Sequence, residues 1–293
     1  MSSKLVVVLG ATGAQGGGVV DALLAQGFKV RGVTRDTSSA SSQKLAAKGA
    51  EVVVGDVLQP ETLKNAFQGA WAVFAVTNFW DPSQMGKEFE IGKGIADAAK
   101  EAGVTYLVWS SLANVQEISK DKWHVPHFTD KAKVADYITK IGLKGIFVGA
   151  AFYFQNFGSF FPPKKDDQGN LVFSMPYSET GLLTAFDVAD VGPAVANILK
   201  NPEEWVGKFI PLYGTHAPVS EYIKTFTEVT GKPAKFNALP SNAFGAEMEH
   251  MFGWFGEFTY YGPNADYSLQ KKVNPNAKTW ADWLKSSGWA NSL

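Results

Sequence analysis

The stretch Val6-Val-Val-Leu-Gly10-Ala-Thr-Gly13-Ala-Gln-Gly16-Gly-Gly-Val-Val-Asp-Ala-Leu-Leu24 decides the fold of this chain. An apolar run that favours a strand leads into a glycine-rich turn, and a pattern typical of an amphipathic helix follows it. In such a unit Gly10 permits the tight turn, Gly13 lets the backbone approach a pyrophosphate, and Gly16 lets helix and strand pack closely. The free N–H groups at the helix start favour an anion. The stretch therefore predicts a dinucleotide-binding loop, whose expected contact residues are Gly10, Thr12, Gly13, Ala14, Gln15 and Gly16.

Up to about residue 150 the chain continues to alternate short β-rich runs with longer helical patterns. This rhythm is typical of βαβ units and a parallel sheet. The expected strands are Leu5–Leu9, Lys29–Val33, Glu51–Val54, Ala72–Val76, Tyr106–Trp109 and Gly145–Val148. The expected helices are Ala14–Gln26, Ser41–Lys48, Pro60–Phe67, Gln84–Ala102 and Thr129–Lys140. We therefore predict an α/β fold in which residues 1–150 form a Rossmann-type, doubly wound parallel sheet that binds the dinucleotide.

The pattern changes after Ala150, where aromatic residues crowd together. Beyond this segment we expect a strand at 208–212 and helices at 220–230, 243–255 and 278–285. A further helix is expected to begin at Asp187 or Asp190, because aspartate is a good N-cap residue, and to end at Leu199. We predict that residues 151–293 form a smaller α/β C-terminal domain over the nicotinamide end of the cleft, with some later segments returning to the first domain.

The composition excludes several classes of function. With 27 Lys and Arg against 28 Asp and Glu, the net charge of −1 provides no general field for a nucleic-acid backbone. There is no cysteine, which excludes disulfides and thiolate metal sites, and His124, His216 and His250 lack metal-ligand spacing. The uncharged stretch 145–163 is interrupted by Gln, Asn, Gly and Pro, so we interpret it as a buried strand followed by a pocket-lining segment. We expect no metal, direct nucleic-acid or membrane partner, a location in the cytoplasm or also in the nucleus, and a monomer or homodimer.

The end of the second strand predicts which dinucleotide is bound, because that position faces the adenosine ribose. Arg35 comes first after the strand and would clamp a 2′-phosphate, which favours NADP(H). The alternative is that Arg35 is a solvated charge and that Asp36 holds the ribose of NAD(H). If Arg35 binds the phosphate, we expect NAD(H) to bind more weakly than NADP(H). Further cofactor contacts are expected from Asp56, which also suits a turn, and from residues at the ends of later strands: Thr77, Asn78, Phe79 and Phe152.

With the glycine loop, Arg35 and Ala75-Val-Thr-Asn78-Phe-Trp80 in place, the chain resembles the NmrA-like family of atypical short-chain dehydrogenase/reductases and is similar to its NADPH-sensor members. The resemblance extends over nearly the whole chain, through Gly49–Asp56, His127-Phe-Thr-Asp-Lys131, Asp187–Pro193 and Pro202–Gly207. It implies a Rossmann domain with a smaller second domain, NADP(H) binding, and regulation through protein partners, transcription factors among them. The sensor relative has more basic residues after the arginine, where this chain has Thr37–Ala40.

The catalytic pair of typical short-chain dehydrogenases, Tyr-x-x-x-Lys, is absent from its expected place at the start of the helix after the fifth strand. Its place is taken by His127 and Lys131, with Ser110 and Ser111 upstream at the end of a strand. In the interpretation that the resemblance favours, Lys131 only positions the cofactor, His127 is a packing or capping residue, and the protein is a redox sensor that acts through protein partners. In the other, Lys131 or His127 donates a proton while NADPH reduces a carbonyl, enone or aromatic substrate.

Two aromatic-rich segments have three possible roles. They are the run from Phe147 to Phe161 and the stretch with Met248, Met251, Phe252, Trp254 and Phe255. They would line an apolar substrate pocket over the nicotinamide, form the core between two domains, or present a protein-binding face. The composition is the same in all three cases, so the sequence leaves them open.

Overall fold

The structure is a computed structural model that describes residues 4–293. Seven strands form one sheet in the order β11-β6-β5-β4-β1-β2-β3, and every neighbouring pair is parallel. Their bounds are β1 Leu5–Val8, β2 Lys29–Thr34, β3 Glu51–Val54, β4 Ala72–Ala75, β5 Tyr106–Ser111, β6 Lys144–Ala150 and β11 Phe209–Leu212. The strand order reverses between β1 and β4, and open α/β sheets bind ligands beyond the carboxyl ends of their strands at such a point.

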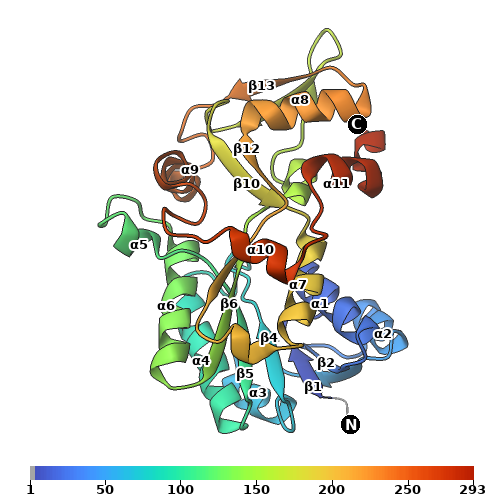
Figure 1. Cartoon of the computed structure of the whole chain (residues 1–293), viewed down its shortest axis with the longest axis vertical. Helices are drawn as coiled ribbons and strands as arrows, with labels where there is room; N and C mark the ends of the chain where they lie inside the picture. Colours follow the sequence, from blue (N-terminus) through green and yellow to red (C-terminus); the bar gives the residue numbers. More distant parts are fainter. Residues whose placement is uncertain (1–3) are drawn as a thin grey trace.

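Helices cover both faces of this sheet in the lower part of Figure 1. They are α1 Ala14–Ala25, α2 Ala40–Ala47, α3 Pro60–Ala66, α4 Glu88–Glu101, α5 Val115–Ile118, α6 Pro126–Lys140 and α7 Val191–Ile198. Strand β1 shows why its sequence is a continuous apolar run: Val6 and Val8 belong to the hydrophobic cluster on one face, and Val7 belongs to the cluster on the other. All three are completely buried. A strand buried on both sides needs no polar alternation.

Helix α7 is tied to α1 at a crossing of two glycines. A Cβ atom added to Gly192 would lie 2.1 Å from the carbonyl oxygen of Gly18, so the two helix backbones touch directly. Both α7 and β11 follow residue 150 in the chain, yet one packs on α1 and the other extends the sheet beside β6. We keep the domain boundary at residue 150 as a proposal, with these two elements as segments that return to the first domain.

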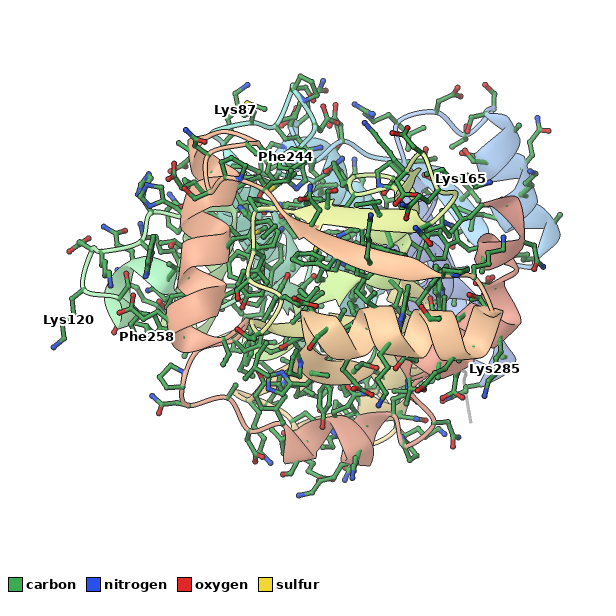
Figure 2. The ribbon with its side chains drawn as sticks, turned by 90° about the horizontal axis from the view of Figure 1, so that it is seen from above. Lys87, Lys120, Lys165, Phe244, Phe258 and Lys285 are labelled. Carbon is green, nitrogen blue, oxygen red and sulfur yellow. The ribbon has the colours of Figure 1, made fainter. Side chains whose placement is uncertain are left out.

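The remaining chain forms a second unit, seen above the sheet in Figure 1. It has two small sheets, of strands β7, β10 and β12 and of strands β8, β9 and β13. Their bounds are β7 Phe152–Tyr153, β8 Lys164–Lys165, β9 Leu171–Met175, β10 Leu182–Phe186, β12 Thr215–Pro218 and β13 Ala234–Ala238. The helices are α8 Val219–Thr230, α9 Ala246–Phe258, α10 Ser268–Val273 and α11 Trp280–Ser287. Seen from above, α9 runs along one side of this unit, with Phe258 at its end (Figure 2).

The Rossmann-type sheet and the mixed α/β character are as predicted, but several helix starts are not. The helix expected from Gln84 begins at Glu88, because residues 81–87 form turns in which Asp81 accepts hydrogen bonds from Ser83. The helix expected from Thr129 already begins at Pro126, which suits a first helical turn. The sequence analysis also missed α5, α10 and all the strands of the two small sheets.

Two helix starts in the second half also differ from expectation, and a third agrees with it. The helix expected from Ala243 begins at Ala246 and continues to Phe258. Asp187 caps a short 3-10 turn, and Asp190 is the N-cap residue of α7, as one of the two expected starts required. The last helix begins at Trp280 rather than at 278, because Thr279 forms a capping box with Asp282.

Candidate functional site

A cavity of about 740 Å³ opens at the carboxyl ends of the parallel strands. All the residues that the sequence predicts for the cofactor or for catalysis lie on its wall: Gly10, Thr12, Gly13, Ala14, Gln15, Gly16, Arg35, Asp56, Thr77, Asn78, Phe79, His127, Lys131 and Phe152. The cavity therefore brings together side chains that the sequence separates by up to 142 positions, from Gly10 to Phe152.

The glycine loop has the geometry of a phosphate cradle. Gly10 adopts a positive φ of 62°, and the N–H of Gly13 donates to its carbonyl oxygen at 2.8 Å. A Cβ atom added to Gly16 would lie 2.2 Å from that same oxygen, so the loop and helix α1 leave no space for a side chain. Beside the loop, the Oε1 atom of Gln15 is buried without a hydrogen-bond partner in residues 4–293, while its Nε2 donates to the Tyr153 hydroxyl at 2.7 Å. These features fit a dinucleotide, because the backbone N–H groups are accessible and a buried acceptor remains available.

The two residues that follow β2 have different surroundings. Arg35 is exposed on the cavity wall, and within residues 4–293 its guanidinium makes no ion pair or hydrogen bond. The chain has one other arginine, Arg31, which is bound to Glu51 and to two backbone carbonyls. Asp36 does not lie on the cavity wall; its carboxylate accepts hydrogen bonds from the Ser38 side chain and backbone, which hold its pKa below the usual range. The geometry therefore favours Arg35 over Asp36 as the ligand of the adenosine ribose or its phosphate.

Asp56 closes a turn and also lies on the cavity wall. One carboxylate oxygen accepts the N–H of Leu58 at 3.0 Å and so closes a turn, while the residue also forms part of the cavity wall. Asn78, further along the wall, donates its backbone N–H to Gln84 at 3.2 Å and leaves its side chain exposed. Both residues retain polar atoms that can bind a ligand.

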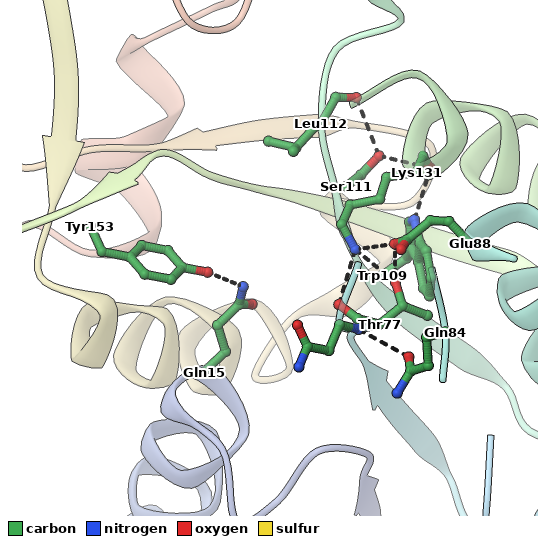
Figure 3. Close-up of polar contacts among 10 residues, drawn as sticks. Gln15, Thr77, Gln84, Glu88, Trp109, Ser111, Leu112, Lys131 and Tyr153 are labelled. Carbon is green, nitrogen blue, oxygen red and sulfur yellow. Dashed lines mark hydrogen bonds and ion pairs between the residues drawn. The ribbon is translucent and has the colours of Figure 1, made fainter. Parts of the chain in front are cut away.

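A buried ionic cluster lies behind the middle of the cavity (Figure 3). The Lys131 ammonium donates to the Thr77 hydroxyl at 2.7 Å, to the Thr77 carbonyl at 3.2 Å and to the Glu88 carboxylate. Glu88 is completely buried, and its second oxygen has no partner in the described chain. Because a buried carboxylate is costly without a cation, Glu88 and Lys131 each require the other.

His127 is bound by a residue from the second unit. Its Nδ1 atom hydrogen-bonds to the carboxylate of Glu247 on α9, 120 residues away in the chain. The imidazole packs between Phe79 and Trp80, with both ring centroids at 5.3 Å. Upstream, Ser110 lies on the cavity wall, whereas the Ser111 hydroxyl is turned inward to the Lys131 carbonyl at 3.4 Å. His127 is thus a partly buried member of an ionisable pair rather than an isolated packing residue.

The aromatic segments divide between two of the roles left open by the sequence. Phe154, Phe157, Trp254 and Phe255 are core residues, with at most 2% of their surface exposed. Other members of the same segments line the cavity: Phe152, Tyr153, Phe160, Phe161, Met248 and Met251, with Tyr260. Phe160 and Trp80 are 56% and 42% exposed, and both belong to the cavity wall. The cavity therefore combines the predicted cofactor site with a largely apolar wall, and we call the part bounded by these side chains the aromatic chamber.

Sequence reasoning missed Glu88, Glu247, Gln84 and Tyr153. Glu88 stands between Lys87 and Phe89, with Glu90 next in the chain, so its sequence neighbours give no clear signal for a buried partner. Glu247 has no signal at all, because its contact with His127 depends on how α9 packs on the cofactor side of the molecule. Only the three-dimensional arrangement identifies these partners.

Across residues 4–293, no helix is long and apolar enough to span a bilayer. The same part of the chain contains no group of three or more His, Asp or Glu side chains arranged to bind a metal ion.

Comparison with known proteins adds family information to this geometry. The profile of the NmrA-like family matches residues 2–290. The NmrA-like family domain-containing oxidoreductase ptmS of Penicillium ochrochloron is 34% identical, over 94% of this chain and 91% of its own. Two solved structures titled as NmrA, a negative transcriptional regulator, are 24% identical and cover 100% of this chain and 99% of theirs: the complex with NADP superposes with a TM-score of 0.85 and the complex with NAD with 0.86.

Proposed function

The chain belongs to the NmrA-like family, and on this premise we propose that it binds NADP(H) and uses it to reduce a planar, apolar carbonyl, quinone or enone compound. The observation that carries the proposal is that one cavity is lined by the glycine loop, by Lys131 and by the aromatic and methionine side chains of the aromatic chamber. The relative ptmS, which is named an oxidoreductase, is consistent with this proposal.

The cofactor would be held by groups along the wall of the sheet. N–H groups of the glycine loop would bind the pyrophosphate, and Arg35 would bind the 2′-phosphate. Asp56 would accept from the adenine amino group, and Lys131 would place a positive charge beside the nicotinamide ribose. When bound, NADPH supplies a hydride at this end of the cavity.

The aromatic chamber would select the substrate by shape and polarity. Its aromatic and methionine side chains offer flat, polarisable surfaces and few hydrogen-bonding groups, which favours a conjugated ring system over a sugar or an acid. The exposed rings of Trp80 and Phe160 would contact a substrate at the entrance. The regulatory role that the family resemblance implies, with a protein partner such as a transcription factor, stays a prediction.

The decisive experiment measures binding and turnover on the same purified protein. Dissociation constants for NADP⁺, NADPH, NAD⁺ and NADH are determined by titration, and NADPH consumption is followed with phenanthrenequinone, menadione and trans-chalcone. Tight NADPH binding with turnover of at least one probe supports the reductase function. Tight binding without turnover on any probe would instead favour the sensor, and no binding of any dinucleotide would overturn both.

A further inference from the structure

The structure offers two candidates for the proton donor of a reduction, Lys131 and His127, and their surroundings differ. We propose that His127 delivers the proton from Nε2 and that Glu247, on α9, is the residue that positions it. This inference rests on the reductase function proposed above. It assigns a role to a hydrogen-bonded pair of residues that come from two different helices, α6 and α9.

Lys131 has no proton left to give. An ammonium group has three N–H bonds, and those of Lys131 are directed to the Thr77 hydroxyl, the Thr77 carbonyl and the Glu88 carboxylate. Donation to a substrate would break one of these bonds and leave the completely buried Glu88 less well compensated. Lys131 is therefore suited to supplying fixed positive charge, and Glu88 to holding it in place.

His127 has the opposite arrangement. Its Nδ1 atom is bound to Glu247, whereas Nε2 has no hydrogen-bond partner in residues 4–293. A carboxylate on Nδ1 keeps the proton on that nitrogen and leaves Nε2 to exchange its proton, as in other carboxylate–histidine pairs. The ring lies on the cavity wall and contacts Phe79 and Trp80, where the predicted cofactor site meets the aromatic chamber.

Glu247 is delivered to His127 by a row of contacts along α9, which we call the α9 seam. Glu257 binds Lys122 at 2.5 Å and the Trp123 indole at 2.9 Å, and His250 accepts the N–H of His124 at 3.1 Å. The contacts run antiparallel, from Glu257 at the C-terminal end of α9 to Glu247 at its start. The same helix places Met248 and Met251 on the cavity wall. Docking of α9 therefore closes the aromatic chamber and orients His127 in one step.

The proton balance of the proposed step is simple. The hydride forms a C–H bond at the carbonyl carbon, the C=O π bond opens toward oxygen, and the Nε2 proton of His127 forms the new O–H bond. His127 is then neutral with its remaining proton on Nδ1, still bound to Glu247. A solvent proton restores Nε2, so each turnover consumes one NADPH and one proton.

Glu247→Gln tests the positioning role, because it removes the charge and keeps the size. We expect kcat for phenanthrenequinone reduction to fall at least about tenfold, with the Kd for NADPH within about twofold of the wild type. Glu249→Gln is the matched control, since it removes a carboxylate from the same helix at a residue that contacts Ser241 and takes no part in the α9 seam. We expect its kcat to stay within about twofold of the wild type. If the wild type turns over the substrate and Glu247→Gln does so equally fast, the proposed role of Glu247 is wrong. If the wild type itself shows no turnover, the proposed reductase function is wrong.

A second measurement needs neither cofactor nor substrate. With imidazole nitrogens labelled with ¹⁵N, the four histidines are distinguished by NMR, and His127 is assigned from the signal lost in His127→Gln. We expect neutral wild-type His127 to carry its proton on Nδ1, and this preference to be lost in Glu247→Ala. Free imidazole side chains favour the proton on Nε2, so observing that form at wild-type His127 would overturn the proposed pair whatever the activity.

Discussion

Replacing Gly16 by alanine tests the cradle at its tightest point. The new Cβ atom would lie 2.2 Å from the carbonyl oxygen of Gly10, 2.6 Å from its carbonyl carbon and 3.0 Å from the nitrogen of Ala11. All three are backbone atoms, so the loop itself must move by about 1 Å to reach an ordinary contact. Overpacking of this kind costs about 1–3 kcal/mol.

Gly17 is the matched control, because it is the next residue of the same helix and its added Cβ would meet only the Ala11 carbonyl, at an ordinary 3.6 Å. Both changes gain about 0.5–1 kcal/mol from the lower backbone entropy of alanine. The difference between the two variants therefore isolates the clash, at about 1–3 kcal/mol. For a chain of this length we expect Gly16→Ala to melt about 2–5 °C below Gly17→Ala.

The assay is thermal unfolding followed by circular dichroism, combined with fluorescence titration of NADPH. A loop displaced by about 1 Å misdirects the N–H groups that would bind the pyrophosphate, so we expect Gly16→Ala to weaken NADPH binding at least about tenfold and Gly17→Ala to leave it within about twofold. Equal melting temperatures and equal affinities for the two variants would refute the assignment of this loop as a phosphate cradle.

Three other changes probe the surroundings of the cavity. Arg35→Ala should lower the ratio of NADP⁺ to NAD⁺ affinity by about 10–100-fold, because it removes charge-assisted hydrogen bonds to the 2′-phosphate. The control Arg31→Ala, measured by the same titrations, should lower the stability of the protein and leave this ratio unchanged. An unchanged ratio in Arg35→Ala would contradict the assignment of Arg35 as the ligand of the 2′-phosphate. Glu88→Gln should lower the free energy of unfolding in urea by about 3–5 kcal/mol, since it leaves a buried ammonium uncompensated, whereas Glu101→Gln, which breaks an exposed ion pair, should cost under about 1 kcal/mol. Burial raises the pKa of the Tyr177 hydroxyl to about 12, above the value near 10 in the unfolded chain. The protonated hydroxyl therefore stabilises the fold fully below pH 10, and about 3 kcal/mol of the free energy of unfolding is lost as the pH rises through 12. Tyr177→Phe should flatten that part of the stability curve in denaturant titrations, and an unaltered curve would contradict the raised pKa.

The first half of the fold was predictable because its local signals agree with its tertiary structure. Strand β3 has the expected bounds, and α3 begins at Pro60 as expected. Glycines with positive φ, such as Gly27 and Gly103, follow the helices where the sequence placed a helix end. Strands β9, β10 and β13 are longer than β1 and β3, but no α-helix separates β7 from β10, so the alternation of strand and helix that reveals the first strands is missing there.

The site was predictable only where one local motif specifies the chemistry. The glycine loop and Arg35 follow from their place after β1 and β2, and His127 and Lys131 from the four-residue spacing of a known catalytic pair. The partners that define their chemical state, Glu247 and Glu88, come from other helices. The hydrophobic periodicity of a sequence indicates which face of a helix is buried. It carries no information about the residues that pack against that face.

The return of β11 and α7 to the large sheet limits how the gene could be shortened. A chain that ended near residue 150 would leave β6 as an open sheet edge along the strand that β11 now covers, and it would strip α1 of the helix packed at Gly18. An unprotected parallel edge is a template for pairing with another copy. The nucleotide-binding half is therefore not expected to fold independently. If it were fused alone to a reporter or exchanged between relatives, it would aggregate unless the chain extended at least to Leu212.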